Sequence, residues 1–317
     1  MIQRRAVTTT LGAALIGLSG LVQAQQAQEI YIPLVSKGFQ HQFWQAVKSG
    51  AEQAAKDLKV KVSFEGPESE SMVDKQIDML SAALAKKPQA IGFAALDSQA
   101  AIPLLKKAQA AKIPVVAFDS GVDSDIPVTT TTTDNKAAAA LAADKMAELI
   151  GKSGEVALVV HDQTSRTGVD RRDGFVNRIK STYPNIKIVS VQYGGGDQLK
   201  STEITKSILQ ASPNLKGIFG ANEGSAIGVV NGVKEMKRSG KVVIIGYDSG
   251  KQQKNAIADG SMAGAITQNP VGMGYKTVEM AVKAIKGEKL PKVVDTGFFW
   301  YDKTNITDPK IAAVLYD

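Results

Sequence analysis

Hydrophobic and polar positions follow a repeating order along the chain, in which short apolar runs alternate with longer amphipathic stretches. The short runs are rich in β-branched residues and predict strands. In the first longer stretch, Phe43, Val47, Gly50, Ala54 and Leu58 fall on one stripe of a helix. The predicted strands cover residues 30–35, 60–64, 90–96, 114–119, 155–160, 187–193, 217–222, 242–248 and 264–268. Further predicted helices cover residues 72–86, 100–111, 137–150, 201–210, 226–237 and 272–285.

The order strand, helix, strand predicts an α/β fold. Successive strands lie roughly 25 to 30 residues apart, which is typical of βαβ units with right-handed crossovers and parallel sheets. This order breaks within residues 120–136, after Gln268 and near Asp295. The first break contains turn residues and a threonine run, which can itself form a strand because Thr favours β-structure. Three breaks predict three crossings of the chain between two lobes.

The first 24 residues match a secretory signal peptide. Arg4 and Arg5 precede an apolar run, and Val22-Gln23-Ala24 fits a cleavage site. The two arginines also match, more weakly, a twin-arginine export signal. No later run approaches the roughly 20 apolar residues of a membrane span, so we expect an exported, soluble protein. The 317 residues, 44% of them hydrophobic, suffice for two domains, and without cysteine the fold uses neither disulfides nor thiolate metal sites.

The charge and the histidines exclude several kinds of partner. The formal net charge of +7 falls to +5 without the arginines of the signal peptide. Basic residues are mixed with acidic ones, so no nucleic-acid surface is expected. His41 and His161 are the only histidines and are far apart in sequence, so neither a metal site nor a cofactor is predicted. Glycines 194–196 lack the ending of a phosphate loop and predict a turn.

Hydrogen-bonding side chains follow the predicted strands. In open α/β sheets, ligands bind outside the carboxyl ends of the strands. Phe43 alternatively packs in the core, and Asp119 or Asp248 alternatively caps the next helix. The set suits a neutral, hydroxyl-rich ligand, since amides and carboxylates bond hydroxyls while aromatic faces cover C–H surface. The strand-end residues are Lys37 through Trp44, Asp97, Asp119, Ser120, His161, Asp162, Asn222, Glu223, Asp248 and Gln268.

Six segments in order resemble the periplasmic sugar-binding proteins of ABC importers, of the ribose-binding type. They are HQFW, VVAFDS, VDRRDGF, FGANE, IIGYDSG and AITQNP, and the resemblance covers essentially the whole exported chain. It implies two Rossmann-like lobes with parallel sheets, joined by a three-crossing hinge, with the ligand cleft between them. One lobe would comprise residues 29–130 and 269–295, and the other residues 131–268 and 296–317. Such lobes close on the ligand like a hinge.

The resemblance also implies a set of ligand contacts. Arg171 is selected by its register with Gly174 and Phe175, and Arg166 and Arg172 compete with it. Each sugar hydrogen bond to a charged group contributes about 1.5–3 kcal/mol. The implied ligand-binding residues are His41, Phe43, Trp44, Asp119, Ser120, Arg171, Asn222, Asp248 and Gln268.

The chain departs from the ribose-binding pattern at four positions. Ser120 stands where the family has an arginine, Ala94 and His41 where it has asparagines, and the glycine run near Gly196 where it has an aromatic residue. Lost donors leave sugar hydroxyls unpaired, at about 1–3 kcal/mol each, so we expect another sugar or a polyol. Candidates for replacement contacts are Gln40, Gln42, Asp97 and Glu223.

The resemblance implies a monomeric periplasmic protein that captures a sugar or polyol and delivers it to an ABC transporter permease. No nucleophile is paired with a base and an orienting group, so no enzyme is predicted. The same pocket would serve a sensing protein that docks on a chemoreceptor or sensor kinase. A hydrolase using Asp97, Asp119 or Asp248 would reveal itself by turnover of the sugar. A repressor of the lactose type is disfavoured by the signal peptide and by the missing N-terminal helix-turn-helix.

Overall fold

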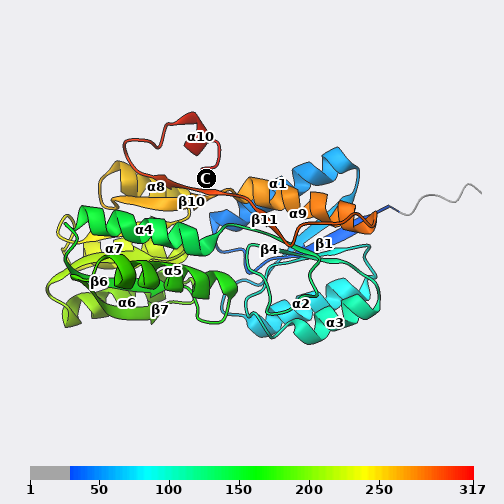
Figure 1. Cartoon of the computed structure of the whole chain (residues 1–317), viewed down its shortest axis with the longest axis horizontal. Helices are drawn as coiled ribbons and strands as arrows, with labels where there is room; N and C mark the ends of the chain where they lie inside the picture. The colour runs from blue at the N-terminus through cyan, green and yellow to red at the C-terminus, as the bar shows by residue number, and fades with distance from the viewer. Residues whose placement is uncertain (1–28) are drawn as a thin grey trace, which may run out of the picture.

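The chain builds two separate six-stranded sheets, one in each lobe. The structure is a computed structural model that describes residues 29–317, and the predicted signal peptide lies outside these residues. Figure 1 shows the two lobes side by side, with the chain passing between them near the middle of the molecule. Within residues 29–317, no helix combines the length and the apolar character that a membrane crossing requires.

The first lobe, here called the N-lobe, contains an entirely parallel sheet. Helices α1 (Gln42–Leu58) and α9 (Pro270–Ile285) cover one face, and α2 (Val73–Ala85) and α3 (Ile102–Ala110) cover the other (Figure 1). In spatial order the strands are β11 (Val293–Asp295), β5 (Thr129–Thr132), β4 (Val115–Phe118), β3 (Ile91–Phe93), β1 (Tyr31–Val35) and β2 (Lys61–Glu65).

The second lobe, the C-lobe, has the same architecture except for one antiparallel strand at its edge. Helices α4 and α5 pack on one face of the sheet, and α6, α7 and α8 on the other. The helices are α4 (Asn135–Leu149), α5 (Arg166–Thr182), α6 (Gln198–Ala211), α7 (Glu223–Glu235), α8 (Lys251–Ala258) and the short α10 (Pro309–Ala312). In spatial order the strands are β12 (Phe298–Tyr301), β10 (Gly264–Gln268), β9 (Val243–Tyr247), β8 (Leu215–Gly220), β6 (Gly154–Val160) and β7 (Ile186–Tyr193).

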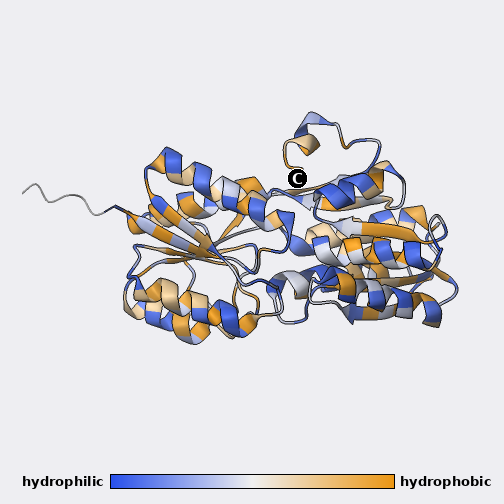
Figure 2. Ribbon diagram, turned by 180° about the vertical axis from the view of Figure 1, so that it is seen from behind, coloured by the Kyte–Doolittle hydropathy of each residue, from blue (hydrophilic) through white to orange (hydrophobic). Residues whose placement is uncertain are grey.

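Apolar side chains of the central strands form the cores. Figure 2 shows hydrophobic residues concentrated on the strands and on the helix faces turned toward them. The predicted stripe of α1 packs in the N-lobe core, where it meets α9 at unusually short range. A Cβ atom added at Gly50 would lie 1.9 Å from the carbonyl oxygen of Val271, and one at Gly274 would lie 1.9 Å from that of Val47. Only glycine permits this close approach of the two backbones.

The chain crosses between the lobes three times, as the three breaks in the sequence pattern predicted. The crossings follow β5, β10 and β11, at residues 133–134, 269 and 296–297. The Thr133 hydroxyl joins all three, because its Oγ1 lies 2.9 Å from Gln268 Oε1 and 3.4 Å from the carbonyl oxygen of Gly297. One side chain therefore contacts residues at the other two crossings.

The threonine run belongs to the N-lobe sheet. Strand β5 pairs with β4 through Thr129, Thr130 and Thr131, and with β11 on its other side through Thr130, Thr131 and Thr132. The predicted division between residues 130 and 131 would cut this strand, whereas the change of sheet follows Thr132. The structure also contains α8, β11, β12 and α10, which the sequence pattern did not predict.

Candidate functional site

A cavity lies between the lobes, at the carboxyl ends of both sets of strands. The space between its lining atoms, including the part open to solvent, is about 260 Å³. The two lobes contribute equally to its lining, and charged, amide and aromatic side chains are all present. The lining residues are Lys37, His41, Phe43, Trp44, Glu70 and Asp119 from the N-lobe, and His161, Thr167, Arg171, Asn222, Asp248 and Gln268 from the C-lobe.

Two aspartates occupy equivalent places at the carboxyl ends of β4 and β9. Asp119 has φ 54° and Asp248 has φ 81°, in the left-handed region that non-glycine residues rarely adopt. Such conformations persist where surrounding structure enforces them and are concentrated at functional sites. Their backbone N–H groups donate to the next strand, Asp119 to the carbonyl of Thr131 and Asp248 to that of Ile266.

The two carboxylates differ in their partners. Asp248 accepts hydrogen bonds from Gln268 Nε2 at 2.8 Å and from the backbone N–H of Glu223 at 3.0 Å. The Asp119 carboxylate accepts none from residues 29–317 and faces the cavity. Burial raises the pKa of Asp119 to about 6, against the opposing charges of Lys37 and Arg171. Burial also raises the pKa of Asp248.

Arg171 is fixed in place by the C-lobe. Its Nε donates to Asn135 Oδ1 at 2.7 Å, and its Nη1 donates to the carbonyl of Ala221 at 2.9 Å. The guanidinium also lies over the ring of Tyr247, 3.8 Å from the centroid. Because arginine has five N–H donors, three remain for a ligand. The competing Arg172 instead pairs with Asp173 at 2.7 Å, and Arg166 with Asp123 at 3.2 Å.

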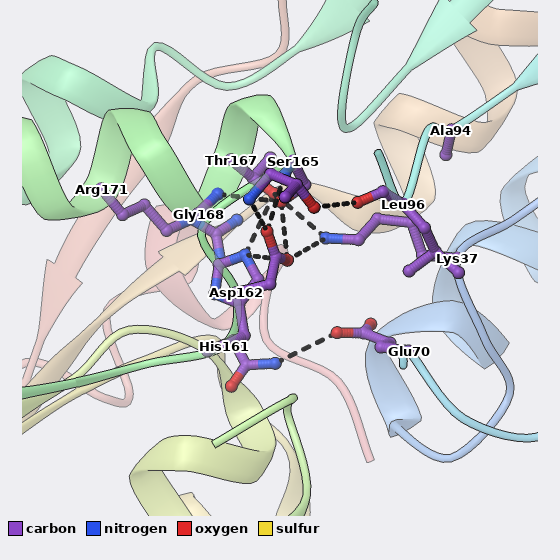
Figure 3. Close-up of polar contacts among 12 residues, drawn as sticks. Lys37, Glu70, Ala94, Leu96, His161, Asp162, Ser165, Thr167, Gly168 and Arg171 are labelled. Carbon is purple, nitrogen blue, oxygen red and sulfur yellow. Dashed lines mark hydrogen bonds and ion pairs between the residues drawn. The ribbon is translucent and has the colours of Figure 1, made fainter. Parts of the chain in front are cut away.

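Lys37 reaches from the end of β1 into the loop that opens α5. Its Nζ donates to Thr167 Oγ1 at 3.1 Å and lies 3.9 Å from Asp162 Oδ2. Figure 3 shows this lysine pointing across the cleft toward Asp162, Ser165 and Thr167. The lysine therefore brings a cation to the cavity from the N-lobe, although Ser120 replaces the arginine of the ribose-binding pattern.

Glu70 gathers polar groups from both lobes. Its carboxylate accepts from Trp44 Nε1 at 2.8 Å and from Asn222 Nδ2 at 3.3 Å, and His41 Nε2 lies 3.9 Å away. Burial by itself raises the pKa of Glu70, but the neighbouring Lys37, His41 and His161 outweigh it and lower the pKa. Glu70 therefore carries its negative charge inside the cleft.

The two histidines are buried with unused hydrogen-bonding capacity. Neither ring nitrogen of His41, nor Nδ1 of His161, has a hydrogen-bond partner among residues 29–317. Burial lowers the pKa of His161 well below its usual value, with the charges of Lys37 and Arg171 adding to the effect. Buried polar atoms without partners are costly, so these nitrogens favour a polar ligand in the cavity.

Eight of the nine residues predicted as ligand contacts line this one cavity. Phe43 and Trp44 line the cavity and also pack in the N-lobe core, and their contact with a ligand stays a prediction. Ser120 is the exception, since it is fully buried beside the cavity and its hydroxyl has no partner among residues 29–317. Ala94 is likewise fully buried and outside the lining.

None of the candidates for replacement contacts lines the cavity. Gln40 accepts from the backbone of Glu70, and Asp97 accepts from the backbones of Gln99 and Ala100. Gln42 and Glu223 instead bond across the lobes. Polar groups come from four residues outside the predicted set: Lys37, Glu70, His161 and Thr167. Lys37 and His161 stand at predicted strand ends, so the strand-end rule points to these two, whereas Glu70 lies several residues beyond the second strand.

The lobes are in contact around the cavity. The backbone N–H of Ser98 donates to the carbonyl of Thr164 at 3.1 Å, and Thr164 Oγ1 donates to the carbonyl of Leu96 at 3.4 Å. Together with the contacts of Lys37 and Glu70, these bonds describe a closed cleft. In the described part of the chain, no cluster of three or more acidic or histidine side chains could hold a metal ion.

Comparisons with known proteins agree with this geometry. The sequence profile described as a periplasmic binding protein domain matches residues 32–289. The D-allose-binding periplasmic protein of Escherichia coli K12 is 29% identical over 284 residues, covering 87% of this chain and 90% of that protein.

Solved structures show the same two-lobed fold. An ABC transporter solute-binding protein from Agrobacterium vitis, bound to α-D-tagatopyranose, has a TM-score of 0.88 at 29% identity and covers 91% of this chain and 100% of its own. A carbohydrate transporter solute-binding protein from Agrobacterium radiobacter, in complex with D-arabinose, has a TM-score of 0.87 at 34% identity, with coverage of 91% and 99%.

Proposed function

We infer that this chain, which belongs to the periplasmic binding protein family, captures a sugar outside the cytoplasm and delivers it to an ABC importer. The observation that carries this inference is the cavity between the lobes, lined by hydrogen-bonding side chains from both lobes and by two aromatic side chains. A ligand held by both lobes binds the closed form better than the open one, and that difference drives closure. The family is one of binding proteins, so the chain binds its sugar without converting it.

We propose that the ligand is a monosaccharide other than ribose. Asp119, Asp248 and Arg171 would bond its hydroxyls, with Asn222, Gln268 and His41 as further partners. Phe43 and Trp44 would cover the apolar face of the ring. Relatives include a D-allose-binding protein, proteins in complex with α-D-tagatopyranose and D-arabinose, and ribose import binding proteins. The cation supplied by Lys37, in place of an arginine beside Asp119, favours a hydroxyl arrangement different from that of ribose.

A thermal-shift screen of residues 25–317 tests this function. The ligands are D-allose, D-tagatose, D-arabinose, D-ribose and small polyols, applied after unfolding and refolding to remove bound sugar. A ligand at about 100 times its dissociation constant adds roughly 2.7 kcal/mol of stability, so one sugar should raise the melting temperature selectively. If ribose gives the largest shift, the proposed selectivity is wrong, and if no sugar gives a shift, the proposed ligand class is wrong.

The proposed location is the periplasm and the proposed partner is the membrane permease of the importer. Export would follow from the predicted signal peptide, and the relative from Escherichia coli is periplasmic by description. The monomeric state and a chemoreceptor partner stay predictions. Cell fractionation would locate the protein, and its copurification with a permease, dependent on the sugar, would identify the partner.

A further inference from the structure

The N-terminus of α1 is capped by a carboxylate from the opposite lobe. Its own N-cap residue, His41, makes no side-chain capping bond. Instead, the Glu223 carboxylate accepts hydrogen bonds from the backbone N–H of Gln42 at 3.0 Å and of Phe43 at 3.1 Å. Glu223 is the first residue of α7 in the C-lobe. An acidic group at this place satisfies free N–H groups and interacts favourably with the helix dipole.

A second contact runs in the opposite direction. Gln42 Oε1 accepts from the backbone N–H of Lys251 at 2.7 Å, at the start of α8 in the C-lobe. The N-cap of α8 is Gly250, which has no side chain to offer. A Cβ atom at Gly250 would lie 2.8 Å from Gln42 Oε1 and 2.9 Å from Glu223 Oε1. The glycine thus leaves room for both contacts, and each lobe caps a helix of the other.

This pair of caps adjoins the cavity without lining it. The backbone N–H of Glu223 donates to the Asp248 carboxylate at 3.0 Å, and the neighbouring Asn222 lines the cavity. On the other side, the capped first turn of α1 carries Phe43 and Trp44. The Glu223 residue is 3% exposed, and among residues 29–317 its carboxylate bonds only to the opposite lobe. Both contacts exist only while the lobes are together.

We propose that Glu223 is a positioning residue that holds the first turn of α1 against the C-lobe and thereby stabilises the closed cleft. It does so without touching the ligand. When the cleft opens, the carboxylate and the two N–H groups return to water. The strength of sugar binding therefore depends on a contact outside the sugar site, because any group that favours the closed form slows release of the enclosed ligand.

The test measures the distance between the lobes by electron spin resonance. The natural chain has no cysteine, so Lys106→Cys on α3 and Gln210→Cys on α6 give one spin label per lobe, both at exposed positions. Distances are measured without sugar and with an excess of D-allose, D-tagatose, D-arabinose or D-ribose. In this labelled background, Glu223→Gln keeps the shape of the side chain but loses the charge and one of the two acceptor oxygens.

We expect Glu223→Gln to lower the ratio of closed to open molecules roughly ten-fold, the effect of losing one hydrogen bond to a charged group. Where a sugar closes the parent, its dissociation rate should rise by a similar factor while its association rate is unchanged. Glu235→Gln is the matched control, since Glu235 lies at the far end of the same helix and, among residues 29–317, pairs only with Lys206, at 3.2 Å. Gln42→Ala removes the second contact without a change of charge and should lower the ratio several-fold.

Equal ratios in Glu223→Gln and the control overturn the proposal. So does a parent protein that shows no short distance under any condition. A closed population that depends on Glu223 but responds to none of the sugars contradicts the proposed ligands and supports the positioning role, so the two failures are distinguishable.

Discussion

The Asp119 carboxylate has the clearest features of a ligand contact among single residues. It is buried, it faces the cavity, and it has no hydrogen-bond partner among residues 29–317. Its equivalent in the other lobe, Asp248, already holds two partners. The hydroxyls of a bound sugar would donate hydrogen bonds to the Asp119 carboxylate, which receives none from residues 29–317.

We expect Asp119→Asn to weaken sugar binding by about ten-fold or more, because a hydrogen bond to a charged group contributes about 1.5–3 kcal/mol. Titration calorimetry with the sugar that stabilises the natural protein measures the change. Asp125→Asn makes the same change of charge at an exposed residue and should leave the affinity unaltered. Equal affinities in the two variants would remove Asp119 from the site.

The same substitution should change the pH dependence of stability of the ligand-free protein. The pKa of Asp119 rises from about 3.8 to about 6 on folding, so the folded state holds the proton more tightly. The free energy of unfolding therefore falls between pH 4 and pH 6, in total by about 3 kcal/mol. Asp119→Asn removes this pH dependence, so the free energy of unfolding of the variant increases relative to that of the natural protein as the pH rises. Urea unfolding at pH 4, 5, 6 and 7 tests this, and a constant difference would show that the pKa is not raised.

The residues that the sequence did not identify as part of the site share a physical reason. Glu70 follows a strand after a loop of turn residues, so nothing in its local pattern separates it from exposed neighbours such as Glu68. Thr167 lies within a helix start, and only the folding of the loop before α5 brings it to Lys37. By contrast, Asp119 and Asp248 directly follow apolar strands, and this position can be recognised from the sequence alone.

At the scale of elements, the contact between α1 and α9 decides the shape of the N-lobe face that carries the aromatic residues. The two backbones touch at Gly50 and Gly274. This contact sets how closely α1, which carries Phe43 and Trp44 in its first turn, packs against α9.

We expect Gly274→Ala to destabilise the protein by about 1–3 kcal/mol. Alanine in a helix gains up to about 1 kcal/mol over glycine, but its Cβ would lie 1.9 Å from the Val47 carbonyl oxygen, and overpacking of this kind costs more. Chemical denaturation measures the difference. Gly121→Ala is the control, since the nearest atoms to its Cβ lie 3.8 Å away. A variant at 274 as stable as this control would show that the helices separate easily.

Long, regular elements were predictable from the sequence, whereas some of the shortest were not. The strands β1, β6 and β9 agree with predicted runs to within a residue or so at each end, because buried parallel strands are continuous apolar segments. Strands β11 and β12 and helix α10 span only three or four residues each, too few for any periodicity. Tertiary pairing rather than local pattern determines them.

For the whole molecule, the central question is how the lobes move while the chain between them stays intact. The chain passes between the lobes at three places. Thr133 lies in the first of these crossings, and its hydroxyl contacts residues at the other two. This hydroxyl therefore links the crossings to one another directly beside the cavity residue Gln268.

We expect Thr133→Val to lower the free energy of unfolding by about 1–3 kcal/mol, because it leaves the buried Gln268 oxygen without its donor. Thr129→Val is a matched control in the same segment, since the buried Thr129 hydroxyl has no partner among residues 29–317, and this change should be neutral or stabilising. Denaturant unfolding compares the two. Equal stabilities would show that the hydroxyl at the crossings is dispensable.

The last residues of the chain lie at the junction of the lobes. The Tyr316 hydroxyl accepts from the backbone N–H of Ser249 in the C-lobe, while its ring packs 6.2 Å from that of Phe43 in the N-lobe. Strand β1, in contrast, begins at the end of the N-lobe away from the C-lobe (Figure 1). An affinity tag or fluorophore fused after Asp317 would therefore lie beside the junction of the lobes, where it would report on their motion or obstruct that motion. A tag fused ahead of Ile30 would lie away from the junction and leave the motion of the lobes unchanged.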